Sequence, residues 1–287
     1  MYQQTFGGDW TEEKLKRIDM YLRAYTKILD KRNFRFAYID AFAGTGYRTL
    51  EQEQYQNELM FPMLFEESLK FYRGSAQIAL QVQPRFTRYI FIEKDIERFK
   101  ELKQLKVDYP ELAEDIWPIN SDCNSYLQDL CLNYKWKRNR AVLFLDPFGM
   151  QVEWNTIEAI ASTKAIDLWL LFPLGVAVNR LLRRDGQISD IFQQKLNNLF
   201  GTTDWFDAFY APKQQPSLFD DDLGLEKRVT LKQIGDYFVQ RLQSVFEHVA
   251  ENPLPLYNSK GNPLYLLCFA AHNKTAVKIA QHILTSR

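Results

Sequence analysis

The chain has 287 residues, of which 46% are hydrophobic and 15% aromatic, and its 36 lysines and arginines equal its 36 aspartates and glutamates in number. This composition is that of a globular protein and excludes an intrinsically disordered chain, which would have fewer aromatic residues and a larger net charge. The zero net charge gives no overall attraction to nucleic acid, so a polyanionic partner would have to bind a local patch.

No apolar run is long enough to cross a membrane, and residues 1–9 lack the basic and apolar stretches of a signal peptide. We therefore expect a cytoplasmic protein. The three cysteines are odd in number and have no C-x-x-C spacing, which predicts reduced thiols and no metal site; they are Cys123, Cys131 and Cys268.

The first half of the chain predicts a parallel sheet covered by helices. An amphipathic helix is expected over residues 11–29, because apolar residues recur there at steps of three and four. Short apolar runs then alternate with helical patterns, as in strands that are buried on both faces; the runs are residues 36–40, 89–93, 116–119, 141–146 and 166–172. The long gap after the first strand predicts an insertion at about residues 47–73.

After residue 172 the alternation stops. Residues 175–210 have helical spacing and residues 212–224 have the composition of an exposed loop, so a second insertion is predicted at about 175–226. The pattern then predicts a long helix, a hairpin and a last helix, at residues 230–249, 254–270 and 274–284. The expected architecture is one α/β domain over residues 1–287, with a mostly parallel seven-stranded sheet that ends in an antiparallel hairpin.

Three acids at successive strand ends predict a ligand site, because open parallel sheets bind ligands beyond the carboxyl ends of their strands. The first is Asp40 in the string Asp40-Ala-Phe42-Ala-Gly44-Thr-Gly46, whose glycines permit a tight turn and close backbone approach. Glu93 has the position from which a carboxylate binds two ribose hydroxyls. Asp122 is placed to receive an adenine amino group.

Each of these features has an alternative interpretation when it is taken alone. The glycines alone are more typical of an ordinary turn than of a ligand site, whereas Glu93 is equally typical of a surface charge and Asp122 of a helix N-cap. Their joint placement after consecutive strands favours an adenosyl ligand. A dinucleotide is disfavoured, because residue 49 is Thr and the third glycine of G-x-G-x-x-G is missing.

The same residues resemble a class I S-adenosylmethionine-dependent methyltransferase. More closely, five segments in order resemble the three-Cys-motif partner protein family: residues 38–46, Gly74-Ser75, residues 91–95, residues 144–149 and residues 264–267. The resemblance covers nearly the whole chain and implies a Rossmann-like fold with S-adenosylmethionine as cofactor. It also implies a partner: in that family the three-cysteine motif belongs to a neighbouring phage Gp37/Gp68-like protein, so the cysteines of this chain are coincidental.

Asp146-Pro147-Phe148 is the predicted catalytic segment. Methyl transfer requires the acceptor's lone pair to be held in line with the methyl group; for an amino group, the Asp146 carboxylate and the Pro147 carbonyl would accept its protons while Phe148 stacks on the ring. The segment is similar to the Asp-Pro-Pro-Tyr/Phe motif of amino-methyltransferases, but its aromatic residue is third and Gly149 is fourth. The alternative is structural: Pro147 ends the strand, Phe148 packs in the core and Asp146 caps a helix.

The leading functional hypothesis is therefore an S-adenosylmethionine-dependent methyltransferase that acts on an amino group, with a nucleobase of DNA or RNA as candidate acceptor. The second is a catalytically inactive methyltransferase-like module that binds its neighbouring protein. A nicotinamide oxidoreductase comes third, because the glycine pattern is short.

Overall fold

The computed structural model describes residues 10–32, 34–42, 74–147, 149–213, 224–258 and 260–286. Its centre is a sheet in which five parallel strands lie in the order β3-β2-β1-β4-β5. The strands are β1 (Arg35–Asp40), β2 (Arg88–Glu93), β3 (Ile116–Asn120), β4 (Asn139–Leu145) and β5 (Ile166–Phe172). All five predicted strands are present, within two residues of the expected limits.

The last strands close the sheet in antiparallel fashion. β10 (Pro263–Ala271) pairs with β5, and its other edge pairs first with β9 (Leu254–Tyr257) and then with β8 (His248–Val249). Because β8 and β9 occupy successive parts of one edge, the sheet has seven positions across its width. This is the Rossmann-like arrangement of class I methyltransferases, so the predicted fold class and the C-terminal hairpin are confirmed.

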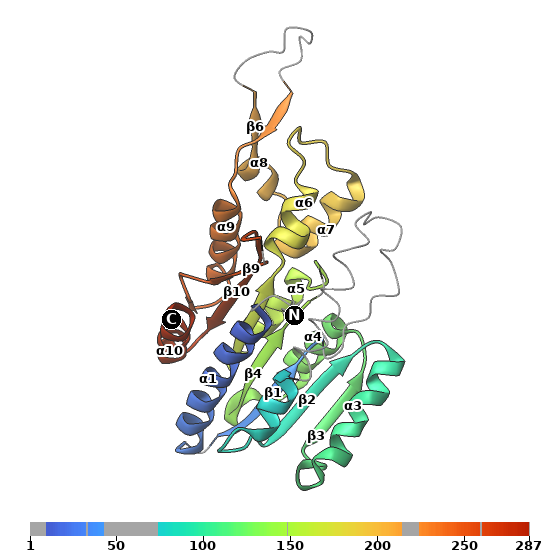
Figure 1. Ribbon diagram of the computed structural model, residues 1–287, viewed down its shortest axis with the longest axis vertical. Helices are drawn as coiled ribbons and strands as arrows, with labels where there is room; N and C mark the ends of the chain where they lie inside the picture. Colours follow the sequence, from blue (N-terminus) through green and yellow to red (C-terminus); the bar gives the residue numbers. More distant parts are fainter. Residues whose placement is uncertain are drawn as a thin grey trace, which may run out of the picture.

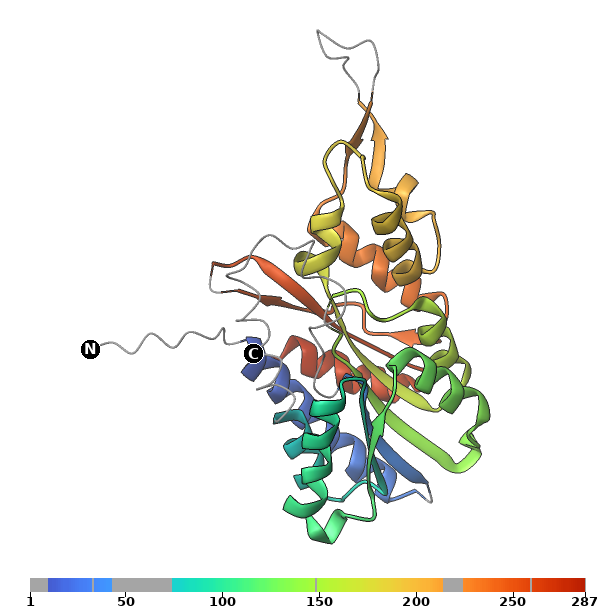
Figure 2. The ribbon, with the colours of Figure 1, turned by 90° about the vertical axis from the view of Figure 1, so that its right-hand side faces the viewer.

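Helices cover both faces of the sheet (Figures 1 and 2). One face packs against α1 (Trp10–Asp30), a helical segment at 74–81, α3 (Ile96–Asp108) and α10 (Lys274–Thr285). The other packs against α4 (Cys123–Asn133), α5 (Trp154–Ser162), α7 (Asp190–Phe200) and α9 (Leu231–Gln243). Two short helical turns, η1 (Pro110–Leu112) and η2 (Trp136–Arg138), precede β3 and β4.

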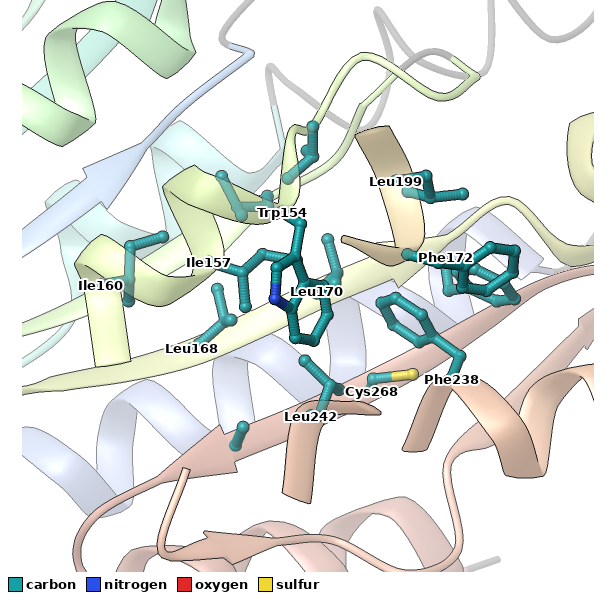
Figure 3. Close-up of a cluster of buried hydrophobic side chains, with 14 of the residues drawn as sticks. Trp154, Ile157, Ile160, Leu168, Leu170, Phe172, Leu199, Phe238, Leu242 and Cys268 are labelled. Carbon is teal, nitrogen blue, oxygen red and sulfur yellow. The ribbon is translucent and has the colours of Figure 1, made fainter. Parts of the chain in front are cut away.

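The core on the α5 and α9 side is shown in Figure 3. Trp154 of α5 lies over β5, and the ring of Phe238 from α9 stacks on Phe172 with ring centroids 4.0 Å apart. Cys268 lies in the same cluster, and all three cysteines are buried and free. Burial of these large side chains on both faces is the main source of the sheet's stability.

The second insertion is less regular than the sequence predicted. In place of one helical stretch over 175–210, the chain forms a π-helical turn η3 (Leu174–Val178), α6 (Asn179–Leu181), α7, α8 (Trp205–Phe209) and β6 (Tyr210–Pro212), which pairs with β7 (Leu225–Lys227). Gly201, with φ of +67°, ends α7 in the left-handed conformation, and Gly186, with φ of +72°, lies in the connection between α6 and α7. The β6–β7 ribbon projects from the body (Figures 1 and 2).

The predicted helix over 230–249 is wrong in its last six residues. Thr230 caps α9 in a capping box, but the helix ends at Gln243, and Val249 pairs instead with Ala270 of β10. Pairing with the free edge of β10 satisfies the backbone groups of this β-branched residue. The first insertion, 47–73, lies outside the described residues.

Candidate functional site

Three acids at the ends of β1, β2 and β4 point to the same face of the sheet: Asp40, Glu93 and Asp146. Asp40 follows Tyr38 by two residues on β1, and side chains two residues apart on a strand share a face. Tyr38 packs in the core beneath α1, and the strands that end at Glu93 and before Asp146 follow the same alternation. The carboxylates of β1, β2 and β4 therefore gather at the carboxyl ends of their strands, on the α1 side.

Asp40 is buried, with 2% of its surface exposed. Its Oδ2 accepts hydrogen bonds from the Tyr38 hydroxyl at 3.1 Å and from the Ser75 hydroxyl at 3.0 Å. Burial raises the pKa of Asp40 to about 7; the two hydroxyl donors and Lys14 oppose this rise, and the nearby charge of Asp146 adds to it. The group therefore changes its charge near neutral pH.

Asp146 is held by a buried cation. Lys14 of α1 has 1% of its surface exposed, and its Nζ donates to Asp146 Oδ2 at 2.6 Å. An ammonium group removed from water is stable only when it is paired and hydrogen-bonded. This ion pair joins the first helix to the end of β4, and it fixes one of the two oxygens of the predicted catalytic carboxylate.

Glu93 has one satisfied and one unsatisfied oxygen. Its side chain is buried, with 3% exposed, and Oε1 accepts the backbone N–H of Asp95 at 2.6 Å. Oε2 is buried without a hydrogen-bond partner among the described residues. Burial raises the pKa of Glu93 to about 7, against the opposing effects of the Asp95 N–H and of Arg98. A buried carboxylate oxygen without a donor is costly, and a ligand hydroxyl would satisfy it.

Asp122 caps α4, as its alternative interpretation predicted. Its Oδ1 accepts the backbone N–H groups of Asn124 and Ser125, and its Oδ2 lies 3.3 Å from Lys94 Nζ in an exposed ion pair. The cap does not test the predicted contact with adenine. Asp122 follows β3, the strand next to β2, so it lies at the same edge of the sheet as Glu93.

The remaining predicted residues are only partly described. Gly44, Gly46 and Phe148 lie outside the described residues, so their predicted contacts with the cofactor and the acceptor are not placed. Phe42 is half-buried against the α4–α5 side of the core, and Pro147 is buried.

Sequence reasoning missed Lys14 and did not assign Tyr38 a role. Lys14 precedes Ile18 by four residues and Tyr21 by seven, which places a lysine on the apolar stripe of α1. That spacing was the available signal, because a lysine on a buried face requires an acidic partner. Ser75, which belongs to one of the segments that carry the family resemblance, donates its hydroxyl to Asp40.

The described residues contain no group of three His, Cys, Asp or Glu side chains arranged to hold a metal ion. Among those same residues, no helix is long and apolar enough to span a membrane.

No protein-family model and no curated protein matches the sequence. Solved structures show distant similarity. A Legionella pneumophila protein described under the family model DUF519 is 12% identical with a TM-score of 0.44, over 94% of this chain and 91% of that one. A spermidine synthase solved with a transition-state analogue is 11% identical with a TM-score of 0.42; the alignment covers 95% of this chain but only 64% of the synthase.

The plantazolicin methyltransferase BpumL, solved with S-adenosylhomocysteine, is 11% identical with a TM-score of 0.30, over 92% of this chain and 86% of that one. Because these three TM-scores are below 0.5 and the identities are 11–12%, we base the function on this chain's own side chains. The resemblance to the three-Cys-motif partner family stays a prediction.

The raised pKa of Asp40 predicts how stability changes with pH. Between the ordinary pKa of an aspartate and about 7, folded Asp40 keeps a proton that the unfolded chain releases. The stability that protonated Asp40 contributes is therefore complete at low pH and is lost as pH rises through about 7. In urea titrations, the wild type should lose about 2 kcal/mol more unfolding free energy between pH 5.5 and pH 8 than the Asp40→Asn variant does. Asp19→Asn, at an exposed pair, should not change that loss; equal pH dependence in wild type and Asp40→Asn would contradict the assignment.

The buried ion pair predicts an asymmetric pattern of destabilisation. Lys14→Met should lower the unfolding free energy by about 3 kcal/mol, because it leaves Asp146 without its cation. Lys94→Met, which removes an exposed ion pair, should cost less than about 1 kcal/mol. In the double variant Lys14→Met/Asp146→Asn, chemical denaturation should show recovery of part of the loss. Equal costs for Lys14→Met and Lys94→Met would show that the pair is not structurally important.

Proposed function

We propose that this protein binds S-adenosylmethionine at the carboxyl ends of β1, β2 and β4 and transfers its methyl group to an amino nitrogen. A nucleobase in DNA or RNA is the acceptor we favour. The observation that carries the proposal is the buried Oε2 of Glu93 beside the end of β2, which has no hydrogen-bond partner within the described part of the chain. The cofactor, the acceptor and the residue roles that follow are part of this proposal.

Glu93 fits the ribose of the cofactor. A carboxylate at the end of the second strand of such a sheet is placed to accept hydrogen bonds from two adjacent ribose hydroxyls. The described residues satisfy Oε1 with a backbone N–H and leave Oε2 without a donor. A ribose hydroxyl would supply the missing donor and would favour the ionised form of the carboxylate.

The charge of the site favours a cation over a phosphate. Asp40, Glu93 and Asp146 bring three carboxyl groups to this edge, and Lys14 is the buried cation that pairs with one of them. The surplus negative charge would stabilise a sulfonium and an ammonium group and would repel a pyrophosphate. A nicotinamide dinucleotide is therefore a poorer fit than S-adenosylmethionine.

Asp146 is the group we assign to the acceptor. When bound, S-adenosylmethionine supplies the electrophilic methyl group. Lys14 holds Asp146 Oδ2, so we assign Oδ1 to accept a proton of the acceptor's amino group. The Pro147 carbonyl would accept a second one, as the sequence motif predicts, and both contacts would turn the nitrogen lone pair toward the methyl group. Phe148 would stack on the acceptor ring.

Calorimetry tests the cofactor directly. We expect S-adenosylmethionine to bind and to release protons near pH 6.5, because its contacts ionise carboxyl groups whose pKa lies near 7. The proton release is measured as a dependence of the binding heat on the buffer's ionisation enthalpy. Glu93→Gln should weaken binding at least tenfold, whereas Glu97→Gln, an exposed glutamate of α3, should not change it.

Transfer is tested with tritiated S-adenosylmethionine and total bacterial RNA or genomic DNA as acceptors. At a saturating concentration of S-adenosylmethionine, Asp146→Asn should lower incorporation at least a hundredfold; saturation is needed because loss of the Lys14 pair also disturbs the cofactor site. Absence of binding heat in the wild type would contradict the proposed function, and equal affinity in wild type and Glu93→Gln would contradict the assignment of the ribose to Glu93.

A catalytically inactive module that binds a neighbouring three-Cys-motif protein is the second candidate. Gly149 favours it, because this residue stands where amino-methyltransferases carry the aromatic ring. It has φ of +71°, and apart from its chain neighbours no atom of the described residues lies within 4 Å of where its Cβ would be. Co-expression of the two proteins should give a complex that co-elutes in size-exclusion chromatography without methyl incorporation. Separate elution, or methylation by this chain alone, would count against this candidate.

A further inference from the structure

The ends of the sheet differ in charge. At the amino ends of the parallel strands, opposite the acidic site, six cations lie on or next to β1, β2, β4 and β5. We call them the basic edge: Arg35, Arg88, Lys137, Arg138, Arg140 and Lys164. Arg35 and Arg140 occupy neighbouring strands, since Arg35 lies opposite Asn139 and Phe36 opposite Arg140. In Figure 1, α1 descends to this edge and β1 returns from it.

The cations of the basic edge make no ion pair with a carboxylate of the described residues. Arg88 donates to the backbone carbonyl of Glu114, and Arg140 to the carbonyls of Trp136 and Asn139. Elsewhere on the surface the pattern is different, because several exposed cations pair with acids one helical turn away; examples are Arg23 with Asp19, Lys100 with Glu97 and Lys232 with Asp236. Arg140 is partly neutralised by the nearby carboxyl group of Asp167 on β5. The positive charge that the edge presents to solvent therefore lies on Arg35, Lys137 and Arg138, which are exposed.

Helix dipoles account for only part of this charge. The helices α4 and α5 end at this edge, at Asn133 and Ser162, and a cation near a helix C-terminus is stabilising. That explains Lys164, which follows α5. It does not explain Arg35 and Arg88, which are on strands. Unpaired cations that gather on strands repel each other, and an anionic partner would remove that cost.

Exposed aromatic rings lie beside these cations. The Arg88 guanidinium stacks over the Trp117 ring at 3.9 Å, and 44% of Trp117 is exposed. Tyr134 is 48% exposed and packs edge-on against Trp136 in the turn that carries Lys137. Aromatic faces interleaved with cations are typical of surfaces that bind single-stranded nucleic acid, because bases stack on the rings while the cations contact phosphates.

We propose that the basic edge binds single-stranded nucleic acid. Phosphates contact Arg35, Lys137 and Arg138, which are exposed, and bases stack on Trp117 and Tyr134. This is the local patch that a chain with zero net charge needs in order to bind a polyanion. A six-residue strand places the basic edge roughly 20 Å from the acidic site at the other end of the sheet. Binding of nucleic acid at the basic edge therefore does not depend on methyl transfer at that site.

The test uses the full chain and a fluorescein-labelled 20-nucleotide RNA of mixed sequence in fluorescence anisotropy titrations. The triple variant Arg35→Gln/Lys137→Gln/Arg138→Gln should raise Kd at least tenfold near 100 mM salt. It should also lower the slope of log Kd against log salt concentration by about 2, since each lost phosphate contact removes about 0.7 from the slope for a single strand. Trp117→Ala should raise Kd about tenfold without changing the slope, because stacking releases no counterions.

The matched control removes the same charge elsewhere. Arg23→Gln/Lys100→Gln/Lys232→Gln takes away three exposed cations from other surfaces and should leave both Kd and slope unchanged. Thermal unfolding followed by circular dichroism checks that each variant is folded. If Arg35→Gln/Lys137→Gln/Arg138→Gln is unfolded, the double variant Lys137→Gln/Arg138→Gln, which changes only the η2 turn, replaces it. The double variant should change the salt slope by at least half as much as expected for the triple variant.

Three results would overturn the proposal. The first is no RNA binding by the wild type at 50 mM salt. The second is equal loss of affinity in the control triple variant. The third is that a polyglutamate peptide with the same charge as the RNA displaces the labelled RNA at the same concentration as unlabelled RNA does. That result would assign the edge to an acidic protein.

Discussion

The buried ion pair between Lys14 and Asp146 is the interaction on which the geometry of the candidate site depends. It joins residues 132 positions apart and holds the start of α1 over the carboxyl end of β4. A buried lysine cannot be left unpaired, so the helix and the strand end are placed together. The same cation lies near Asp40, where it partly opposes the effect of burial on the pKa of that carboxyl.

Around this pair the carboxyl groups are satisfied to different degrees. Asp146 has an ammonium partner and Asp40 has two hydroxyl donors, whereas Glu93 keeps one buried oxygen for which the residues that the structure describes supply no donor. The least satisfied group is where we place the ligand. Charge also differs between the two ends of the strands. Asp40, Glu93 and Asp146 lie at the carboxyl end, and exposed Arg35, Lys137 and Arg138 lie at the amino end, so a net charge of zero conceals two surfaces of different charge.

The sequence was sufficient for the sheet and for the strand-end acids, because burial on both faces and a side-chain period of two depend on local sequence. It was not sufficient where distant residues decide. The partner of Lys14 lies on another element, and α9 stops at Gln243 because the edge of β10 pairs with Val249. Gly201 could have been interpreted correctly: a glycine after an apolar helical stripe is a common C-cap.

The central claim is that the strand-end carboxylates hold an adenosyl ligand with its ribose on Glu93. A crystal structure of the protein with S-adenosylhomocysteine tests it most directly. We predict that a ribose hydroxyl lies within hydrogen-bond distance of Glu93 Oε2, and that the Lys14–Asp146 pair is retained beside the homocysteine end of the ligand. Density for the nucleoside at another place on the molecule, with Glu93 Oε2 still lacking a donor, would contradict it.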